Sequence, residues 1–452
     1  MCMALVVVIL AAGKGSRMKS SIPKVLHNLA GKYLLKHLLD KVKFLNPART
    51  VVVYNQDILK DTIKDEQIIW IKQIEQKGTG DAVRCVFSVL KDLEDSDQVL
   101  ILCGDAPLVF VETLKKLLSL PGKFKILGGY LHDPFGYGRL VFDQNSNFLK
   151  IIEEKEASVS EKQIKNVNSG IVAAEYRWLV RNLPKLICHS NGEYYLTDLA
   201  ALAVQSGEDV QVCLAEDSFE IRGINNLLQL SEAERWYQRQ VANQLMMDGL
   251  KINDPDRFDL RGTVDFDQDV IIGANVLLEG KVKLGKGTVI GNGCCLKDVV
   301  LGERVVVSAY SVLEGAVVED DCVIGPFARL RTGSYLSENS RVGNFVELKK
   351  CKLGNNSKVN HLTYLGDAEI GKNVNIGAGT ITCNYDGYGK FTTKVGDNSF
   401  IGSNVSLVAP LVIEDEVTVG AGSVVTRLVP KGNLALGRGK QVNLKRTKYG
   451  KK

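Results

Sequence analysis

The chain has 452 residues, with 57 basic and 52 acidic side chains and a net charge of +5. Seven of the basic residues lie in residues 438–452, which hold no acidic residue, so the rest of the chain carries −2. This distribution argues against a protein that binds nucleic acid or membrane surfaces generally, because such proteins present basic charge over a whole binding face. At about 150 residues per domain, the length predicts two to four domains.

The ten cysteines form no CxxC pair and no Cys/His cluster, which argues against zinc-finger and redox motifs. The apolar run near the N-terminus has no basic segment before it and enters a Gly-rich loop, so it predicts a buried strand rather than a signal peptide. No apolar stretch reaches the roughly 20 residues that a membrane-spanning helix needs. We therefore expect a cytoplasmic protein with reduced thiols.

The first half of the chain alternates β-rich runs with amphipathic helical runs, which predicts an α/β fold with a mostly parallel, Rossmann-like sheet. Residues 224–248 contain no Gly or Pro and predict one long connecting helix. The expected strands are 5–10, 50–53, 98–102, 125–131 and 210–214, and the clearest expected helices are 79–92 and 111–118.

The first expected strand runs into the Gly-rich loop AAGKGSRM, which is followed by PKVL. Small residues let the backbone approach a nucleotide, and Arg17 and Lys24 add the positive charge that a triphosphate requires. The P-loop and the dinucleotide-binding GxGxxG pattern are both absent. Asp105 follows a second apolar run, where an aspartate can bind a hard divalent cation or, alternatively, cap a turn or helix.

The second half has a period of six residues, with an aliphatic residue opening most units. This pattern predicts a β-helix in which three units form one triangular coil and the aliphatic residues stack inside it. The opening residues are Ile272, Leu278, Leu284, Ile290, Leu301, Val307, Leu313, Val318, Ile324, Leu330, Leu336, Val342, Leu348, Leu353, Val359, Leu365, Ile370, Ile376, Ile401, Leu407, Ile413 and Val419. Residues 382–393 break the repeat and should form a loop that leaves the coil, either functional or merely decorative.

The spacing GxGxR followed by PK resembles that of the sugar nucleotidyltransferases, and this resemblance implies a site for UTP and the UDP-sugar. It also implies one Mg²⁺ held by Asp105 and Asn225, and it gives Cys103 no role. Without it, Glu153 would be a solvated charge and Asn168 a turn residue. The implied nucleotide and sugar contacts are Leu10, Ala11, Ala12, Gly13, Arg17, Lys24, Gln73, Gly78, Thr79, Gly138, Glu153, Asn168 and Asn225.

The repeats resemble those of the hexapeptide-repeat acyltransferases, which implies a left-handed parallel β-helix and a homotrimer. Here His361 is the only histidine of the solenoid, and it matches a catalytic base, with Asn384 expected to orient it. The alternative for His361 is an idle surface side chain. The implied glucosamine-1-phosphate contacts are Arg331, Lys349, Tyr364, Asn375 and Lys390. The implied acetyl-coenzyme A contacts are Ala378, Asn384, Tyr385, Ser403, Ala421 and Arg438.

Both halves together resemble a family of bacterial bifunctional enzymes, with the segments RFDLRG, HLTYLGDAEIG and NIGAGTITCNYDG as its most specific matches. The resemblance implies acetyl transfer from acetyl-coenzyme A to glucosamine-1-phosphate, and then uridylyl transfer from UTP to N-acetylglucosamine-1-phosphate. The predicted domains are residues 1–223, a linking helix at 224–250, and an acetyltransferase domain at 251–452 that ends in the basic tail. The alternatives are another sugar pyrophosphorylase with a regulatory solenoid, and a non-catalytic nucleotide-binding or scaffold subunit.

Overall fold

The computed structural model describes residues 3–444, so most of the basic tail lies outside the described range. The chain divides into two compact units, Met1–Tyr237 and Gln238–Lys452, and the division falls inside helix α7 (Leu227–Met247). The predicted connecting helix is therefore present, while the domain limits stated above remain a prediction. Within the described residues, no helix is long and apolar enough to cross a membrane.

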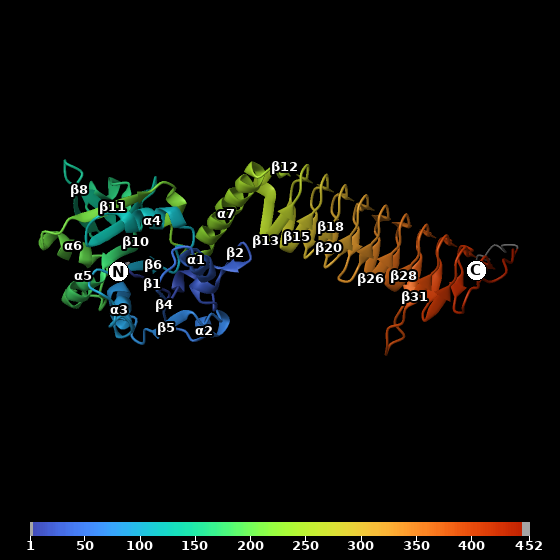
Figure 1. The fold of residues 1–452 in the computed structure, drawn as a ribbon, viewed down its shortest axis with the longest axis horizontal. Coiled ribbons are helices and arrows are strands. Elements are labelled where there is room, and N and C mark those ends of the chain that lie inside the picture. Colours follow the sequence, from blue (N-terminus) through green and yellow to red (C-terminus); the bar gives the residue numbers. More distant parts are fainter. Residues whose placement is uncertain (1–2, 445–452) are drawn as a thin grey trace, which may run out of the picture. The chain divides into compact units, whose positions relative to one another are not determined.

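The first unit is built on a nine-stranded sheet with the strand order β11-β7-β10-β6-β1-β4-β5, extended by β8 and β9 (Figure 1). Neighbours along this path are parallel, except that β10 runs antiparallel to both β6 and β7. The strands are β1 (Leu5–Leu10), β4 (Arg49–Tyr54), β5 (Ile68–Lys72), β6 (Gln98–Cys103), β7 (Phe124–Tyr130), β8 (Arg139–Phe142), β9 (Phe148–Ile152), β10 (Asn166–Glu175) and β11 (Val210–Ala215), with a separate pair β2 (Asn28–Leu29) and β3 (Lys32–Tyr33). All five expected strands are present.

Helices cover both faces of this sheet, because successive side chains of β1 point to opposite sides. Val7 and Ile9 pack in one apolar cluster with α1 and α4, while Val6 and Val8 pack in another with α3, α5 and α6. The helices are α1 (Leu34–Lys43), α2 (Ile58–Thr62), α3 (Gly78–Arg84), α4 (Val111–Ser119), α5 (Tyr176–Asn182) and α6 (Asp198–Gln205). This arrangement confirms the α/β prediction.

The helix expected at residues 79–92 is shorter than predicted. It ends at Arg84, and a 3₁₀ helix continues over Cys85–Val89. The residues after Arg84 include valine, phenylalanine and cysteine, which lose side-chain freedom in an α-helix, so the local sequence does not sustain it.

The second unit is a parallel β-helix whose strands stack coil upon coil in two long sheets. The first sheet contains β12 (Lys251–Ile252), β14 (Ile271–Ile272), β16 (Val289–Ile290), β19 (Val306–Val307), β22 (Val323–Ile324), β25 (Arg341–Asn344), β27 (Lys358–His361), β29 (Asn375–Ile376), β32 (Phe400–Ile401), β35 (Thr418–Val419) and β37 (Leu434–Ala435). The second contains β13 (Phe258–Phe266), β15 (Val276–Leu284), β17 (Cys295–Lys297), β18 (Val300–Leu301), β20 (Val312–Glu314), β21 (Val317–Val318), β23 (Arg329–Leu330), β24 (Tyr335–Leu336), β26 (Glu347–Leu353), β28 (Tyr364–Ile370), β30 (Ile381–Cys383), β31 (Thr393–Val395), β33 (Ser406–Val408), β34 (Leu411–Ile413) and β36 (Val424–Val425).

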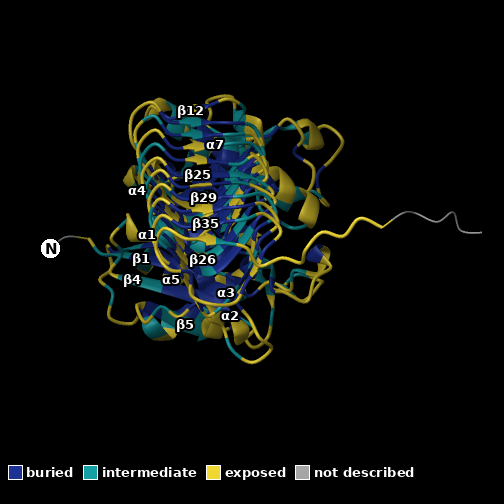
Figure 2. Cartoon of the chain, turned by 90° about the vertical axis from the view of Figure 1, so that its right-hand side faces the viewer, coloured by how far each residue is buried: buried dark blue, intermediate teal, exposed yellow. Residues whose placement is uncertain are grey.

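The predicted inward-facing aliphatic residues form the core of this β-helix. Every opening residue named in the sequence analysis is at most 3% exposed, and Figure 2 shows the buried strands inside the coil with exposed loops around it. Ile290 pairs with Val307, and Val307 with Ile324, so one coil takes 17 residues here. The six-residue period therefore predicted both the architecture and the core.

Residues with positive φ mark the corners of each coil. In the coil that begins at Val342 these residues are Phe345, Lys350 and Asn356, and in the next coil they are Leu362, Asp367 and Asn373. We name the corner of Phe345 and Leu362 the first corner, that of Lys350 and Asp367 the second corner, and that of Asn356 and Asn373 the third corner.

The predicted interruption of the repeat is confirmed. Ile376 pairs with Ile401, 25 residues further on, whereas the coil before takes 17 residues and the coil after takes 18. The added residues leave the coil after β30 as a loop closed by a bridge between Tyr385 and Lys390. At the loop's tip Tyr388 is 99% exposed.

Two adjacent valines allow the contribution of the core to stability to be measured. Val318 is 2% exposed inside the coil, whereas Val317 is 40% exposed on its outer surface. We expect Val318→Ala to lower the free energy of unfolding by about 1–3 kcal/mol, because it removes buried methyl groups and leaves a cavity. The matched Val317→Ala variant should change it by less than about 0.5 kcal/mol. Urea unfolding of both variants makes the comparison, and equal losses would contradict this assignment of inside and outside.

Candidate active sites

The Gly-rich loop and Asp105 follow neighbouring strands of the first unit. The backbone N–H of Gly104 donates to the carbonyl of Leu10 at 2.9 Å, which joins the end of β6 to the end of β1. A Cβ on Gly104 would lie 2.8 Å from that same oxygen, so only glycine fits there. From β1 the chain continues to β4 on one side, and β6 is added on the other. Such a reversal at the carboxyl ends of strands is where α/β sheets bind ligands.

Four predicted site residues from distant parts of the chain meet at this point. Lys24 Nζ bonds to Asp105 Oδ2 and, at 3.0 Å, to Asn225 Oδ1. Arg17 Nη2 also donates to Asn225 Oδ1, at 2.8 Å. Because one ammonium group touches both oxygens, Asp105 and Asn225 are close enough to share a single cation. One carboxylate and one amide oxygen, with phosphate oxygens and waters completing the shell, suit Mg²⁺.

The segment around Gln73 forms a second group beside the same loop. Gln73 is 3% exposed, and its amide donates to the Gly78 carbonyl at 3.1 Å and to Asp81 Oδ2 at 2.8 Å. Gln76 donates to the carbonyl of Ala12, which ties this segment to the Gly-rich loop. Thr79 Oγ1 accepts the Leu196 N–H at 3.0 Å. The structure thus brings Gln73, Gly78 and Thr79 together near the loop of residues 10–13.

A third group contains Gly138, Glu153 and Asn168. The Asn168 N–H donates to the Gly138 carbonyl at 2.9 Å. A Cβ on Gly138 would lie 3.4 Å from Glu153 Oε1, so these residues are neighbours. Burial raises the pKa of Glu153, while a hydrogen bond from Thr197 Oγ1 at 3.3 Å lowers it. Thr197 is not among the predicted site residues, because nothing in the local sequence indicates that it faces Glu153.

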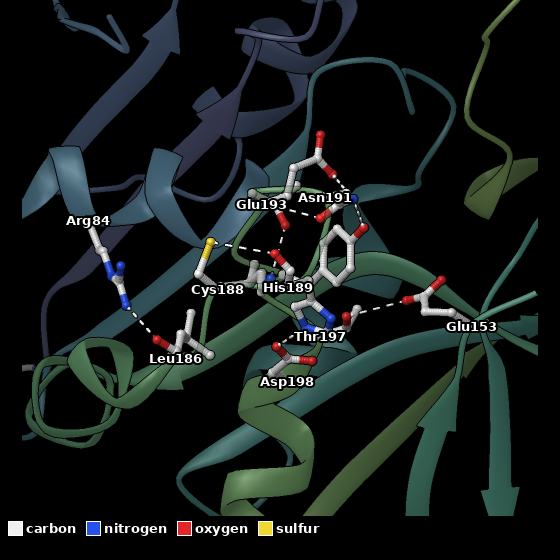
Figure 3. A network of polar contacts seen from close by, with 12 residues as sticks. Arg84, Glu153, Leu186, Cys188, His189, Asn191, Glu193, Thr197 and Asp198 are labelled. Carbon is white, nitrogen blue, oxygen red and sulfur yellow. Dashed lines mark hydrogen bonds and ion pairs between the residues drawn. The ribbon is translucent and has the colours of Figure 1, made fainter. Parts of the chain in front are cut away.

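Figure 3 shows the surroundings of Glu153 and Thr197. The next residue, Asp198, begins α6 and accepts from His189 Nε2 at 2.8 Å. The ring of His189 lies 4.4 Å from that of Tyr195. These contacts hold the segment between α5 and α6 against α6, and they fix the position of Thr197 beside Glu153.

The second corner of the β-helix gathers three cationic side chains. Arg331 donates to Glu347 Oε1 at 3.0 Å. The positive charges of Lys390 and Arg331 lower the pKa of Lys349, and Lys390 is the larger cause. Lys390 reaches Lys349 from the loop that leaves the coil. Cations held this close repel one another unless an anion lies between them, so the cluster suits a phosphate group.

Tyr364 and Asn384 lie at the same corner. A Cβ on Gly366 would collide with Tyr364 Oη and lie 2.8 Å from Asn384 Nδ2. Tyr364 and Asn384 can therefore occupy this space only because residue 366 is a glycine. Gly366 pairs with Lys349 on the preceding coil. Asn384 Nδ2 donates to Asp367 Oδ2 at 2.5 Å. Asn384 therefore belongs with the cationic cluster.

His361 lies at the first corner, and its partner differs from the prediction. His361 Nδ1 bonds to Asn344 Oδ1 at 2.9 Å, whereas Asn384 bonds to Asp367, so within one chain Asn344 rather than Asn384 orients His361. Asn344 is the strand partner of His361, which lies on the next coil along the chain. A side-chain carbonyl only accepts, so this contact favours the neutral tautomer with the hydrogen on Nδ1 and the lone pair on Nε2. The 17-residue coil length could have identified Asn344.

Four of the six residues predicted for acetyl-coenzyme A form a column that begins at His361, namely Ala378, Ser403, Ala421 and Arg438. The backbone N–H of the residue that follows Ala378 donates to the His361 carbonyl. In the same way, the residue that follows Ser403 donates to the Ala378 carbonyl, and the residue that follows Ala421 donates to the Ser403 carbonyl. Arg438 Nη1 then donates to the Ala421 carbonyl at 2.8 Å. The column thus runs along successive coils from the His361 imidazole to the Arg438 guanidinium, with small side chains between them.

The remaining predicted contacts are more dispersed. Asn375 pairs with Lys358 and Phe400, on the face that leads to the first corner. Tyr385 is exposed in the loop, and its hydroxyl donates to the Gly387 carbonyl at 2.6 Å. His361 and Lys349 thus lie at different corners of the coil, and the strand from Tyr364 onward runs between them.

Comparison with known proteins agrees with both halves. Residues 7–124 match the model of the MobA-like NTP transferase domain, residues 260–364 that of the GMPPB C-terminal domain, and residues 392–427 that of six bacterial transferase hexapeptide repeats. The chain is 46% identical over 443 residues to the bifunctional protein GlmU of Marinobacter nauticus, and the match covers 97% of each chain. The chain therefore belongs to the GlmU family of bifunctional enzymes, with uridylyltransferase and acetyltransferase activities on one polypeptide.

Proposed function

We propose that the group at the ends of β1 and β6 transfers the uridylyl group of UTP to N-acetylglucosamine-1-phosphate. The observation that carries this proposal is the meeting of Arg17, Lys24, Asp105 and Asn225, which are far apart in the sequence. The cations and the amides of the loop at residues 10–13 would hold the triphosphate while the sugar phosphate attacks the α-phosphorus and pyrophosphate leaves. Positioning and charge stabilisation are sufficient for such an in-line transfer.

We assign Mg²⁺ to the oxygens of Asp105 and Asn225. When bound there, the ion would neutralise charge on the nucleotide and sugar phosphates. With the ion present, Lys24 would be released from Asp105 to contact a phosphate. Gln73, held in place by its bonds to Gly78 and Asp81, would face the uracil, and Glu153 and Asn168 would face the sugar.

For the β-helix, we propose acetyl transfer from acetyl-coenzyme A to the amine of glucosamine-1-phosphate. Arg331, Lys349 and Lys390 would hold the phosphate, and the column from His361 to Arg438 would hold the coenzyme. His361 Nε2, left with its lone pair by the bond to Asn344, would accept the proton from the amine as nitrogen attacks the thioester carbon. The thioester C–S bond then breaks, and the imidazolium would return that proton to the sulfur, so that coenzyme A leaves as the thiol.

We further propose a homotrimer in which the first corner of one subunit meets the second corner of the next. Tyr310, Phe327 and Phe345 stack at the first corner with ring centroids 5.4 Å apart, and Leu362 follows them, all exposed. Bulky residues at positive φ are unfavourable, so an exposed apolar ladder of this kind suits contact with another chain. Leu362 directly follows His361, so a subunit that covers this ladder would approach the imidazole.

In this arrangement, we assign Arg438 to the same subunit as His361. Arg438 bonds to Ala421 of its own chain, in the column that begins at its own His361. We therefore assign the cationic cluster of the second corner, rather than Arg438, to the neighbouring subunit.

Light scattering at the assay concentration is expected to show a trimer, since closed cyclic symmetry repeats the shared site three times. A mixture of inactive His361→Ala and inactive Lys349→Met subunits should regain acetyl transfer after dissociation and reassembly, because one unaltered first corner can meet one unaltered second corner. An active monomer, or a mixed assembly without regained activity, would contradict the shared site.

We place the enzyme in the cytoplasm, as a source of UDP-N-acetylglucosamine for peptidoglycan and lipopolysaccharide. The nine cysteines within residues 3–444 are all free thiols, which agrees with a reducing compartment. Cys294 and Cys322 are buried in the coil and donate to backbone carbonyls, so they pack the core.

A further inference from the structure

The loop of residues 104–110, which contains Asp105 and connects β6 to α4, is held by a hydrogen bond from a lysine. Lys41, on the last turn of α1, is partly buried, and its ammonium donates to the Pro107 carbonyl at 2.7 Å. Pro107 lies two residues beyond Asp105, and Lys41 comes from α1, outside both the Gly-rich loop and the 104–110 loop. Fixing a long lysine side chain costs conformational entropy, which the hydrogen bond to Pro107 and the burial of the side chain offset when they hold the loop in place.

A buried glutamate holds the far end of the same loop. Glu220 is 0% exposed, and its Oε2 accepts the N–H of Phe110 at 3.0 Å. Glu220 lies in the 3₁₀ helix Ser218–Ile221, and four residues later the Ile224 N–H donates to the Asp105 carbonyl at 2.8 Å. Asn225 comes next. One short segment therefore holds the Asp105 loop at two points and also supplies the second proposed metal ligand.

Lys41 and Glu220 also interact through their charges. Burial lowers the pKa of Lys41 to about 8, and the carboxylates of Glu220 and Glu112 oppose that shift. A buried carboxylate without a cation nearby is costly, so the Lys41 ammonium is expected to offset part of the cost of burying Glu220.

We propose that Lys41 and Glu220 are positioning residues for uridylyl transfer, which hold the 104–110 loop so that the Asp105 carboxylate faces the same cation as Asn225. This inference rests on the proposed metal role of Asp105. It extends that role to two side chains that touch neither substrate nor metal. Partners that orient metal ligands in this way typically affect metal affinity 10–100-fold when removed.

The test uses the full-length enzyme with UTP and Mn²⁺ as a paramagnetic probe. Lys41→Met should bind Mn²⁺ about tenfold more weakly by electron paramagnetic resonance, and its amides at residues 104–110 should exchange hydrogen faster. Lys43→Met is the matched control, since Lys43 lies on the same helix but forms an exposed pair with Asp65. The double variant Lys41→Met/Glu220→Gln should bind Mn²⁺ more tightly than Lys41→Met, because it removes the unpaired buried charge and keeps an oxygen for Phe110.

Unaltered Mn²⁺ affinity in Lys41→Met would overturn the proposal, even if exchange in the loop were faster. No gain in the double variant over Lys41→Met would also overturn it, because the two charges would then not act together. Asp105→Ala in the same assay separates this inference from the proposed function. If Asp105→Ala binds Mn²⁺ normally, the metal site itself is wrong. If Asp105→Ala loses Mn²⁺ binding while Lys41→Met binds normally, the metal site is supported and only the positioning role of Lys41 and Glu220 is wrong.

Discussion

Replacing Asp105 with alanine is expected to lower uridylyl transfer by more than about 100-fold, because even partners of metal ligands cost 10–100-fold when removed. The variant loses the carboxylate that Asn225 complements, and Lys24 loses its ion-pair partner. Acetyl transfer should be unchanged, since His361 and the cationic cluster belong to the other unit of the chain. Separate assays of the two half-reactions measure both effects.

Asp95→Ala provides the matched control for this variant. Asp95 lies on the same unit and forms an exposed pair with Arg177, so its loss should leave both half-reactions near the unmodified rate. Normal magnesium-dependent formation of the UDP-sugar by Asp105→Ala would show that the metal lies elsewhere. A parallel fall in acetyl transfer would show instead that the substitution disturbs the whole chain.

Replacing His361 with alanine is expected to lower acetyl transfer by about 10²–10⁴-fold, the usual contribution of a positioned general base. The proposed trimer should persist, because His361 is exposed and makes no contribution to the apolar core. Uridylyl transfer should be unaffected when N-acetylglucosamine-1-phosphate is supplied directly. An acetyl-transfer rate within about twofold of the unmodified enzyme, far outside this range, would show that His361 is an idle surface side chain.

Asn344 gives a finer test of how His361 works. Asn344→Ala removes the acceptor that keeps hydrogen on Nδ1, so acetyl transfer should fall less than in His361→Ala and its pH dependence should change. Asn356→Ala is the matched control, because Asn356 lies at the third corner. Its side chain donates to Asn373 at the same corner of the next coil. Similar pH profiles for the two asparagine variants would contradict the positioning of His361 by Asn344.

The sequence was sufficient to predict the β-helix because its core repeats along the chain. Each inward residue, such as Val307, lies one coil from its strand partner, so a local period determines the three-dimensional neighbour. The first unit was predictable at the level of strands, since β1 and β6 are short apolar runs. The residue at which α3 ends could not be predicted, because helix propensity falls gradually along Cys85–Val89.

Contacts between distant residues were beyond the sequence pattern alone. Lys24 and Asn225 are 201 residues apart, and only the sheet order brings the segments that carry them together. The resemblance to a family named both residues but gave no contact between them. Asn344 could have been predicted, because it lies one coil length before His361 in the sequence. The repeat was used only to predict the inward aliphatic residues, and not to find the polar neighbours of His361. Lys41 belongs to an ordinary amphipathic helix, and no local feature distinguishes it from Lys43.

Two independent sites on one chain should act in sequence, and mass spectrometry of the products can follow both steps in one reaction. Glucosamine-1-phosphate, acetyl-coenzyme A, UTP and Mg²⁺ are supplied together. The unmodified enzyme should yield UDP-N-acetylglucosamine, Asp105→Ala should stop at N-acetylglucosamine-1-phosphate, and His361→Ala should leave glucosamine-1-phosphate unchanged. Mixing the two variants should restore the final product. Formation of UDP-N-acetylglucosamine by either variant alone at the unmodified rate, or its absence with the unmodified enzyme, would contradict the account.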